Sequence, residues 1–357
     1  MKKRKLRVGI IGAGWPGQQH ARAIAESAEA EVYACAEADR TRAEEFQSIF
    51  APQKRYADYR DLLGDPGVDA VVICLPNFLH FPATLAALEA SKHVLCEKPP
   101  TLNGPEMVLL REEAAKRGLV YFFSRQFRFS PAMRRARELI AEQRLGQIYF
   151  AEATWVRSRG IPLGVGGWFT EKARSGGGAL IDIGIHALDA AWFLMGTPRP
   201  LSVSAAVFQN FPHLVKNAVF DVEDSAFAFV RFANGAVVQL KTSWAGNLTD
   251  EIPEGQIFGR ELNNCTIYGN KATIRLRPLT LFEDVKGKLV DRALEPADDA
   301  DSFVLQMQNF LEAIAGRAAP MNSAEQAVYL MEMLDAIYLS SATGREVPIA
   351  RAGKTPA

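Results

Sequence analysis

Apolar residues in the first third of the chain form short continuous runs, and each run is followed by a longer segment with helical spacing. The runs are expected to be β-strands at residues 6–11, 32–36, 71–75, 94–96 and 119–123. The segments between them are expected to be helices at residues 18–30, 41–50, 59–63, 80–91 and 104–117. Continuous apolar strands are typically buried on both faces. Their alternation with helices predicts a doubly wound parallel sheet, the Rossmann fold.

From Gln147 onward the expected strands are longer, and apolar and polar residues alternate along them. These strands are expected at residues 147–157, 201–209, 225–232, 237–244, 265–268 and 272–276. Such alternation is typical of an antiparallel sheet with one face toward solvent. Asn234-Gly235 is a hairpin turn signal between two of the strands. Two helices, at residues 302–315 and 323–341, are expected to follow.

The two patterns predict two domains. We expect an α/β Rossmann domain at residues 1–124 and, at residues 125–343, an α+β domain with a large, mainly antiparallel open sheet. The C-terminal helices are expected to close back on the first domain, and residues 344–357 to form a loose tail. Because helices would cover only one face of the open sheet, its other face is free to join subunits. A homodimer or homotetramer is therefore expected.

The composition is typical of a cytoplasmic protein with two full cores. The 357 residues include 41 Lys and Arg and 41 Asp and Glu, so the charge predicts no nucleic-acid or membrane partner. Too few apolar residues follow the basic start for a signal peptide, and no apolar run reaches the length of a membrane span. The four cysteines lie in apolar runs without metal-ligand spacing, so we expect reduced core residues and no metal site.

The first strand leads directly into a glycine-rich turn, Gly12-Ala13-Gly14-Trp15-Pro16-Gly17, which is followed by a helix. Gly12 permits the tight turn, Gly14 lets a pyrophosphate approach the backbone, and Gly17 lets the helix pack on the strand. Pro16 suits the first helical turn, where its missing N–H costs little. Free N–H groups at the helix start favour phosphates. The turn, with Trp15 and Pro16 in it, is therefore predicted to bind a dinucleotide.

A carboxylate follows the second strand. Glu37 lies 37 − 17 = 20 residues after Gly17, the spacing at which an acidic residue binds the ribose hydroxyls of NAD and repels a 2′-phosphate. Asp39 is a second candidate for this role. Arg40 beside it would tolerate NADP, so NAD is favoured and NADP stays open. For Glu37 alone, a solvated acidic turn would be the simpler interpretation.

The stretch at residues 94–100 places charged side chains at the carboxyl edge of the sheet, where open α/β sheets bind ligands. Its strand ends at Glu97 and Lys98, and two prolines fix the backbone just past the lysine. The preceding strand ends in Pro76-Asn77, and His80 opens the next helix. We expect all of these residues at the cofactor, with Lys98 between cofactor and substrate.

A glycine run at residues 176–178 opens a helix on which Asp182 and His186 are four residues apart. They therefore share one helical face. A carboxylate beside an imidazole sets its tautomer and orientation, as a general base requires. Two other interpretations stay open: a buried histidine satisfied by Asp182, and a metal pair, for which no third ligand is visible. A catalytic acid/base pair is the best fit, because a nicotinamide site is already predicted.

With these motifs, the chain resembles the Gfo/Idh/MocA oxidoreductases, the family of glucose–fructose oxidoreductase and inositol dehydrogenase. The resemblance runs from Leu6 to about Ser341. Its specific part is Glu97-Lys98-Pro99 at this distance from the glycine turn, combined with the later Asp182-x-x-x-His186.

The resemblance implies a role for each matching residue. Lys98 would contact the nicotinamide ribose and the reacting oxygen. His186 would exchange the hydroxyl proton, and Asp182 would bind a neighbouring hydroxyl and assist that transfer. Arg128 would point into the substrate cleft, and Trp168 would lie near the nicotinamide or the sugar. An exposed arginine and a packed tryptophan fit these last two positions nearly as well.

The resulting hypothesis is an NAD(P)-dependent dehydrogenase that oxidises a ring secondary alcohol of a sugar, glycoside or cyclitol such as inositol. One alternative is a glycoside hydrolase that uses bound NAD for internal oxidation and elimination. The lack of a secretion signal and the intact Asp182 and His186 speak against it. The other alternative is a dinucleotide sensor without catalysis, which would need neither Lys98 nor His186.

Overall fold

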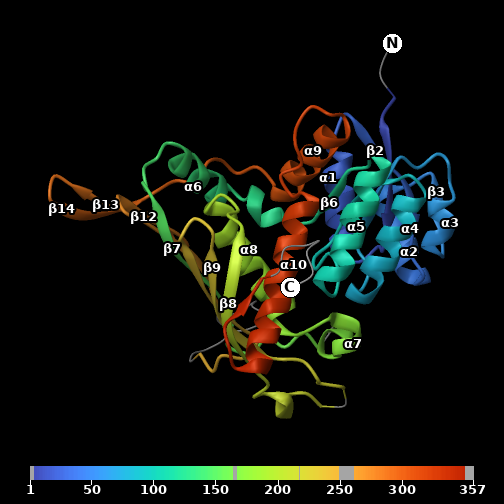
Figure 1. Ribbon diagram of the computed structural model, residues 1–357. Helices are drawn as coiled ribbons and strands as arrows, with labels where there is room; N and C mark the ends of the chain where they lie inside the picture. Colours follow the sequence, from blue (N-terminus) through green and yellow to red (C-terminus); the bar gives the residue numbers. More distant parts are fainter. Residues whose placement is uncertain (1–3, 164–166, 217, 249–260, 350–357) are drawn as a thin grey trace. The chain divides into compact units, whose positions relative to one another are not determined.

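The computed structural model describes residues 4–163, 167–216, 218–248 and 261–349 (Figure 1). Contacts divide the chain into two compact units. Unit 1 consists of Met1–Phe129 and Ala300–Val328, and unit 2 of Ser130–Asp299 and Tyr329–Ala357. The second segment of unit 1 is thus separated from the first by 170 residues of unit 2 (299 − 130 + 1). Each unit is described by itself.

Unit 1 contains a parallel sheet of six strands in the order β3-β2-β1-β4-β5-β6. The strands are β1 Leu6–Ile11, β2 Ala30–Ala36, β3 Lys54–Tyr56, β4 Ala70–Ile73, β5 His93–Cys96 and β6 Tyr121–Phe123. The strand order reverses on either side of β1, so the carboxyl end of β1 is the switch point at which such sheets bind ligands. The predicted Rossmann fold is confirmed.

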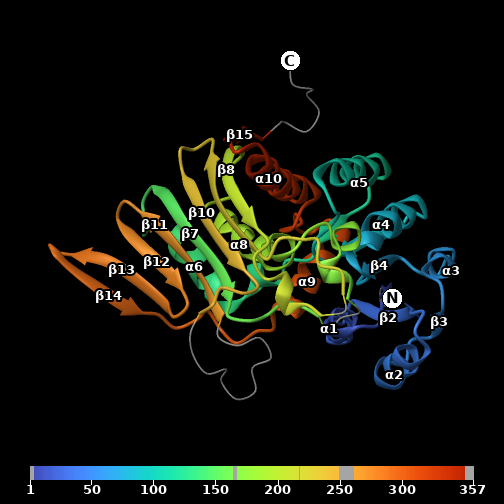
Figure 2. The same ribbon diagram turned by 90° about the horizontal axis from the view of Figure 1, so that it is seen from below.

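Helices cover both faces of this sheet (Figures 1 and 2). They are α1 Trp15–Ala25, α2 Arg40–Phe50, α3 Tyr59–Leu63, η1 Asn77–Leu79, α4 His80–Glu89, α5 Gly104–Arg117, η2 Gln126–Phe129 and α9 Ser302–Ile314. Helix α4 packs against α5, and α9 packs against α1 and η2. Met307 and Phe310 of α9 are buried in the same core cluster as Ile10 and Ile24. Unit 1 is therefore complete only with its distant C-terminal segment.

Unit 2 contains a sheet of nine strands in the order β14-β13-β12-β11-β7-β10-β9-β8-β15. They are β7 Ile148–Arg157, β8 Pro200–Phe208, β9 Ser225–Phe232, β10 Val237–Ser243, β11 Glu261–Gly269, β12 Ala272–Leu276, β13 Leu279–Val285, β14 Lys288–Ala293 and β15 Val347–Pro348. The β10–β7 pair is parallel and the other pairs are antiparallel. The expected large, mainly antiparallel sheet is confirmed.

One face of this sheet is covered by helices (Figure 2). The helical segments of unit 2 are α6 Pro131–Ala141, η3 Trp168–Thr170, α7 Lys172–Ser175, the π-helical turn η4 Leu180–Gly184, α8 Ile185–Leu194 and η5 Pro212–Leu214. Helix α10 Ala324–Thr343 begins in unit 1 and ends in unit 2. Helix α8 packs against β7, β10 and β11, and α6 packs against β12.

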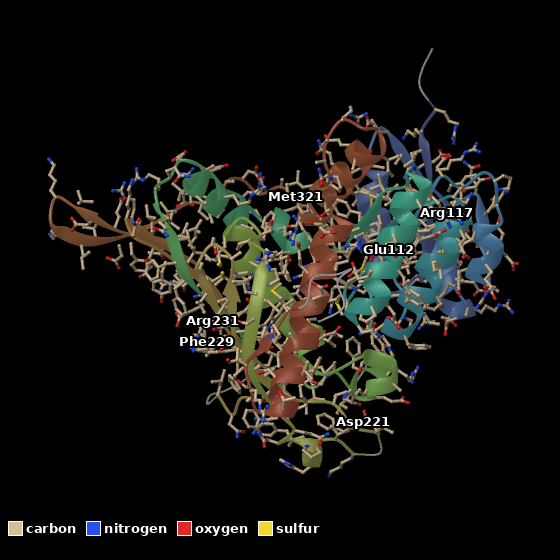
Figure 3. The ribbon with its side chains drawn as sticks, in the orientation of Figure 1. Glu112, Arg117, Asp221, Phe229, Arg231 and Met321 are labelled. Atoms are coloured by element: carbon tan, nitrogen blue, oxygen red, sulfur yellow. The ribbon has the colours of Figure 1, made fainter. Side chains whose placement is uncertain are left out.

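The other face of the sheet exposes apolar side chains. Along β9, Ala226, Ala228 and Val230 are buried, while Phe227 and Phe229 are each 43% exposed. Figure 3 labels Phe229 together with Arg231, which lies on the same side of the strand. The alternation has period two, as a half-buried strand requires. Unit 2 therefore has a helix-covered face and a face with exposed aromatic residues.

The elements differ from the sequence-based expectations mainly at short or polar segments. Strand β3 was not expected, because Lys54–Tyr56 is short and polar. The hairpin β13–β14 and strand β15 were not expected either. Strand β15 pairs with β8 inside the expected tail, and residues 350–357 of that tail lie outside the described residues. Helix α1 begins at Trp15 rather than at residue 18, because Gly14 is its N-cap and Pro16 occupies its first turn.

The segment Lys172–Leu194 is long and apolar enough to cross a membrane by length and composition alone. Its most apolar window has a mean hydropathy of 1.3, but 94% of that window is buried inside the protein. Within the described part of the chain, this candidate comprises α7, η4 and α8 and belongs to the core of unit 2.

Candidate active site

The glycine turn after β1 contains two glycines that the fold requires and one that faces open space. A Cβ on Gly12, whose φ is +95°, would lie 2.4 Å from the carbonyl oxygen of Cys74. A Cβ on Gly17 would lie 2.1 Å from the carbonyl oxygen of Gly12. A Cβ on Gly14 would meet only Pro16 Cδ, at 3.9 Å. Gly12 and Gly17 are therefore needed for the fold itself, whereas Gly14 leaves an approach to the backbone.

The start of α1 is open to an anion. Its N-cap, Gly14, provides no side-chain hydrogen bond to the first helical N–H groups. Trp15 at the first helical position is 64% exposed. Because free N–H groups and the helix dipole favour negative charge, this end fits the pyrophosphate of a dinucleotide. Binding of the cofactor at the turn and the helix start stays a prediction.

Glu37 connects the glycine turn to the end of β2. One carboxylate oxygen accepts a hydrogen bond from the N–H of Ala13 at 2.9 Å. The other accepts from the N–H of Asp39 at 2.9 Å and from Arg42 Nη2 at 3.1 Å. Arg40, the residue expected to accommodate NADP, instead pairs with Glu44 on the surface of α2. The cation beside Glu37 is Arg42, which sequence reasoning missed because the pairing depends on the start of α2 at Arg40.

Glu97 holds the segment that carries Lys98. Its Oε1 lies 2.8 Å from Nε2 of the fully buried His20 on α1, and its Oε2 accepts the N–H of Lys98 at 3.1 Å. Burial would raise the pKa of Glu97, but hydrogen bonds from His20 and Ser124 and the positive charges nearby lower that pKa to about 2. The carboxylate is therefore ionised at neutral pH and links α1 to the ends of β5 and β6.

His80 lies between two main-chain carbonyl groups. Its Nδ1 is 2.6 Å from the oxygen of Pro99, and its Nε2 is 2.7 Å from the oxygen of Leu75. Asn77, which opens the 3₁₀ turn before α4, is also buried. With both ring nitrogens against the backbone, the geometry of His80 favours a role in holding the strand ends over the expected direct contact with the cofactor.

Asp182 and His186 lie on one buried helical segment of unit 2. Asp182 is in η4 and His186 in the first turn of α8, and they are 8% and 7% exposed. The indole Nε1 of Trp244 donates to Asp182 Oδ2 at 3.0 Å, and Arg157 Nη1 lies 3.9 Å from the same oxygen. The ring of Trp155 is 5.6 Å from that of His186. The carboxylate is thus fixed in place, and π-helical turns such as η4 are frequent at functional sites.

The start of this segment is held by a second buried carboxylate. Glu223 accepts hydrogen bonds from the N–H groups of Gly178 and Leu180, both at 2.9 Å, and from the hydroxyl of Tyr338 at 3.0 Å. A Cβ on Gly178 would lie 1.8 Å from the carbonyl oxygen of Glu223. Burial raises the pKa of Glu223, while these hydrogen bonds act to lower it. Sequence reasoning missed Glu223, because its partners Gly178 and Leu180 are 45 and 43 residues away.

The two residues expected at the substrate have different surroundings. Arg128 is fully buried, and its Nη1 donates to the carbonyl oxygen of Met321 at 2.8 Å and to Gln326 Oε1 at 2.5 Å (Figure 3 labels Met321). These bonds favour a structural role for Arg128 within unit 1 over the expected contact with substrate. Trp168 is half-buried in η3, where its ring stacks on Phe169 at a centroid distance of 3.9 Å. Its contact with substrate stays a prediction.

Within residues 4–163, 167–216, 218–248 and 261–349, no three His, Cys, Asp or Glu side chains are grouped so that they could hold a metal ion. All four cysteines lie in this part of the chain and are free thiols. Burial raises the pKa of Cys35 to about 12, so this thiol stays protonated at neutral pH. Among the described residues, the candidates for a functional site are therefore the polar side chains at the carboxyl edge of the unit 1 sheet and those on η4 and α8 of unit 2.

Two family models match the chain. The model for the oxidoreductase family with an NAD-binding Rossmann fold matches residues 6–124, and the GFO/IDH/MocA C-terminal domain matches residues 133–275. A D-glucoside 3-dehydrogenase of Escherichia coli is 31% identical over 98% of this chain and 99% of its own length. A myo-inositol 2-dehydrogenase of Thermotoga maritima is 29% identical over 90% of this chain and 91% of its own.

The fold has similar solved structures. A levoglucosan dehydrogenase in complex with NADH and L-sorbose aligns with a TM-score of 0.86 at 26% identity, covering 98% of this chain and all of the other. The same enzyme in complex with NADH and levoglucosan aligns with a TM-score of 0.84. The first unit is thus an NAD-binding Rossmann domain.

The glycine turn yields a paired prediction. Gly17→Ala should lower the free energy of unfolding by about 1–3 kcal/mol, because its methyl group would press on the Gly12 carbonyl. Gly14→Ala should leave stability within about 0.5 kcal/mol and weaken NADH binding, since its methyl group would occupy the approach to the backbone. Urea unfolding and NADH fluorescence titration measure both. An unchanged NADH affinity of Gly14→Ala would contradict cofactor binding at this turn.

The low pKa of Glu97 yields a pH prediction. Its pKa falls from 4.5 to about 2 on folding, so the carboxylate contributes stability that is present above pH 4.5 and is lost as the pH falls toward 2. This contribution is about 3 kcal/mol. The loss of stability caused by Glu97→Gln should therefore be larger at pH 7 than near pH 2.5, as measured by urea unfolding.

The control for this measurement is Glu112→Gln on α5 (Figure 3), whose side chain is 60% exposed. It should change the unfolding free energy by less than about 0.5 kcal/mol at either pH. Equal destabilisation by Glu97→Gln at both pH values would show that the charge of Glu97 is not what stabilises the fold.

Proposed function

Because the chain belongs to the Gfo/Idh/MocA family of NAD(P)-dependent oxidoreductases, we propose that it oxidises a ring secondary alcohol of a glycoside, with NAD as the hydride acceptor. A D-glucoside is the first substrate to test, because a relative named for that activity is similar over nearly the full length of both chains. Cyclitols such as inositol are the second class, on the basis of a relative with that name.

The observation that carries this proposal is the fixed pair of Asp182 and His186. Both are more than nine-tenths buried, and Trp244 and Arg157 hold the carboxylate of Asp182. The two residues are four apart on one helical segment, and an imidazole that a carboxylate orients is suited to accept a proton from an alcohol. The combination of such a pair with an NAD-binding domain supports alcohol oxidation over simple binding of a dinucleotide.

The proposed roles follow from the chemistry of each side chain. His186 takes the proton of the substrate hydroxyl, and Asp182 orients the imidazole and binds a neighbouring hydroxyl. Lys98, as a cation, stabilises the negative charge that develops on the reacting oxygen. Bound NAD supplies the acceptor for the hydride. Glu37 binds the adenosine ribose, which favours NAD, although Arg42 beside it is a ready partner for the phosphate of NADP.

We also propose that the chain forms a homo-oligomer through the exposed face of the unit 2 sheet. On this face, Phe227 and Phe229 of β9 and Leu262 of β11 are each 43% exposed. Exposed aromatic residues grouped on one face are typical of interaction surfaces. The same face also includes Lys241 on β10 and Glu152 on β7, so it offers polar contacts beside the apolar ones.

The activity is tested by the absorbance of reduced nicotinamide after mixing the protein with NAD⁺ or NADP⁺ and a panel of D-glucosides, levoglucosan and inositols. Reduction of NAD⁺ by one group identifies the substrate class and the cofactor. Glycoside cleavage without net reduction would support the internal-redox hydrolase instead. No reduction of NAD⁺ or NADP⁺ with any compound of the panel, and no glycoside cleavage, would contradict the proposed function.

With the substrate identified, His186→Asn should lower kcat by about 10²–10⁴-fold, the usual contribution of a general base. The matched control is His213→Asn, since His213 is exposed in η5, and this change should leave kcat within a factor of about two. Stopped-flow and steady-state rates of both variants give the comparison. Wild-type turnover in His186→Asn would rule out general-base catalysis by His186.

The oligomer is tested by light scattering on the full chain of 39.2 kDa. The wild type should have a mass of two or four chains, and Phe229→Lys should lower that mass by placing a charge in the interface. Leu109→Lys on α5 of unit 1 is the control, because Leu109 is 54% exposed and does not belong to the unit 2 sheet. A monomeric wild type would overturn the proposed interface.

A further inference from the structure

The ring of His80 joins the ends of two neighbouring strands of the parallel sheet. It is 1% exposed, and its nitrogens lie 2.6 Å from the oxygen of Pro99 and 2.7 Å from the oxygen of Leu75. Leu75 follows β4 by two residues, and Pro99 follows Lys98 directly. The histidine therefore spans the carboxyl edge at the point where Lys98 leaves the sheet.

Both contacts cannot be hydrogen bonds if the ring is neutral. A neutral imidazole carries one N–H, and its other nitrogen presents a lone pair. Carbonyl oxygens only accept, so a neutral ring would place this lone pair against an oxygen at less than 2.8 Å. Only the imidazolium form, with a proton on each nitrogen, donates to Leu75 and Pro99 at the same time.

We propose that His80 is a positioning residue for Lys98 and that it acts as an imidazolium, donating one hydrogen bond to Leu75 and one to Pro99. This inference rests on the proposed function as far as Lys98 is the group that stabilises the reacting oxygen. The protonation of His80 itself does not depend on which substrate the enzyme uses.

The Lys98 segment is then held from two sides. Glu97 accepts the N–H of Lys98 through Oε2 and is itself bound to His20. His80 holds the carbonyl of the next residue, Pro99. The main chain on both sides of the Lys98 side chain is thus tied to buried groups from two different helices, α1 and α4.

The charged groups around His80 determine at which pH it donates to both Leu75 and Pro99. Burial lowers the pKa of His80 below its usual 6.5, and Lys98 acts in the same direction, while the two carbonyl groups and the Glu97 carboxylate raise it. Both hydrogen bonds are therefore present only at a pH below this lowered pKa. As the pH rises through this pKa, the ring keeps one proton and releases one of the two carbonyl groups.

His93 is an internal reference for a histidine ring that carries one proton. His93, at the other end of β5, accepts the N–H of Val120 on Nδ1 at 3.0 Å. That nitrogen must carry a lone pair, so His93 holds a single proton on its other nitrogen, and burial lowers its pKa as well. His80 and His93 thus differ in what their backbone partners require: His80 is buried at the start of α4, and His93 is half-buried at the start of β5.

The decisive experiment is ¹⁵N NMR of the histidine rings in the full chain, which has five histidines. His80→Gln and His93→Gln identify the two sets of signals. As the pH is lowered from about 8 through the acidic range in which the chain stays folded, His80 should take up a proton on its second ring nitrogen, while His93 should keep one. A single proton on His80 throughout this range would overturn the proposal.

Kinetics test the connection to Lys98. In His80→Gln both N–H donors are on one nitrogen and no longer match the positions of the two ring nitrogens. We therefore expect kcat to fall about tenfold, as small displacements of a catalytic group do. KM for NAD should change less than kcat, and the change of kcat with pH that reflects His80 should disappear. His93→Gln should retain wild-type kcat. Unchanged kcat and pH profile in His80→Gln would show that His80 does not position Lys98.

These readouts separate the two proposals. A wild type that reduces NAD⁺ with none of the panel substrates contradicts the proposed function, while the NMR result on His80 stands by itself. An active enzyme whose His80 carries one proton throughout the pH titration contradicts the proposed pair of hydrogen bonds and leaves the proposed function intact.

Discussion

The buried carboxylate of Glu97 is the group on which the edge of unit 1 depends. An ionised carboxylate away from water is very costly unless hydrogen bonds and positive charges satisfy it. Here His20 from α1, the N–H of Lys98 and Ser124 after β6 satisfy it together. These partners come from three separate parts of the Rossmann sheet. The charge therefore fixes the positions of α1, Lys98 and the end of β6 relative to one another.

Unit 2 also contains a buried carboxylate that accepts backbone hydrogen bonds, but here it holds the start of a helical segment. Glu223 is buried and binds the first N–H groups of the segment that carries Asp182 and His186. The start of a helix is normally a binding place for external anions. In this unit the protein's own carboxylate occupies that place, so the partial positive charge of the helix start stabilises the fold rather than a ligand.

The sequence predicted those parts of the structure that depend on local pattern. Continuous apolar runs led to the Rossmann sheet, glycine spacing led to the turn before α1, and a four-residue interval placed Asp182 and His186 on one helical segment. Strand β3 was missed because Lys54–Tyr56 has no apolar periodicity. Arg40 was chosen over Arg42 because the pairing with Glu37 depends on how the turn before α2 directs each side chain.

Other features depend on contacts between residues far apart in the chain, and for these the sequence has no signal. The burial of Arg128 depends on Gln326, 198 residues later. The two carbonyl partners of His80 become visible only when the ends of β4 and β5 are side by side. The π-helical form of η4 likewise has no marker in its residues. Types of residue and their spacing were readable, whereas the partners of buried polar groups required coordinates.

The division of unit 1 into two segments affects how the chain can fold as it leaves the ribosome. The sheet of unit 1 is synthesised first, but Met307 and Phe310 of its core arrive only after residue 300. Strand β7 also waits about 80 residues for its parallel neighbour β10. Such distant pairings are slow to form, because a long loop must be closed before any contact stabilises it. Through most of synthesis, the nascent Rossmann sheet therefore exposes the apolar surface that α9 covers, and this surface is open to chaperones or to aggregation.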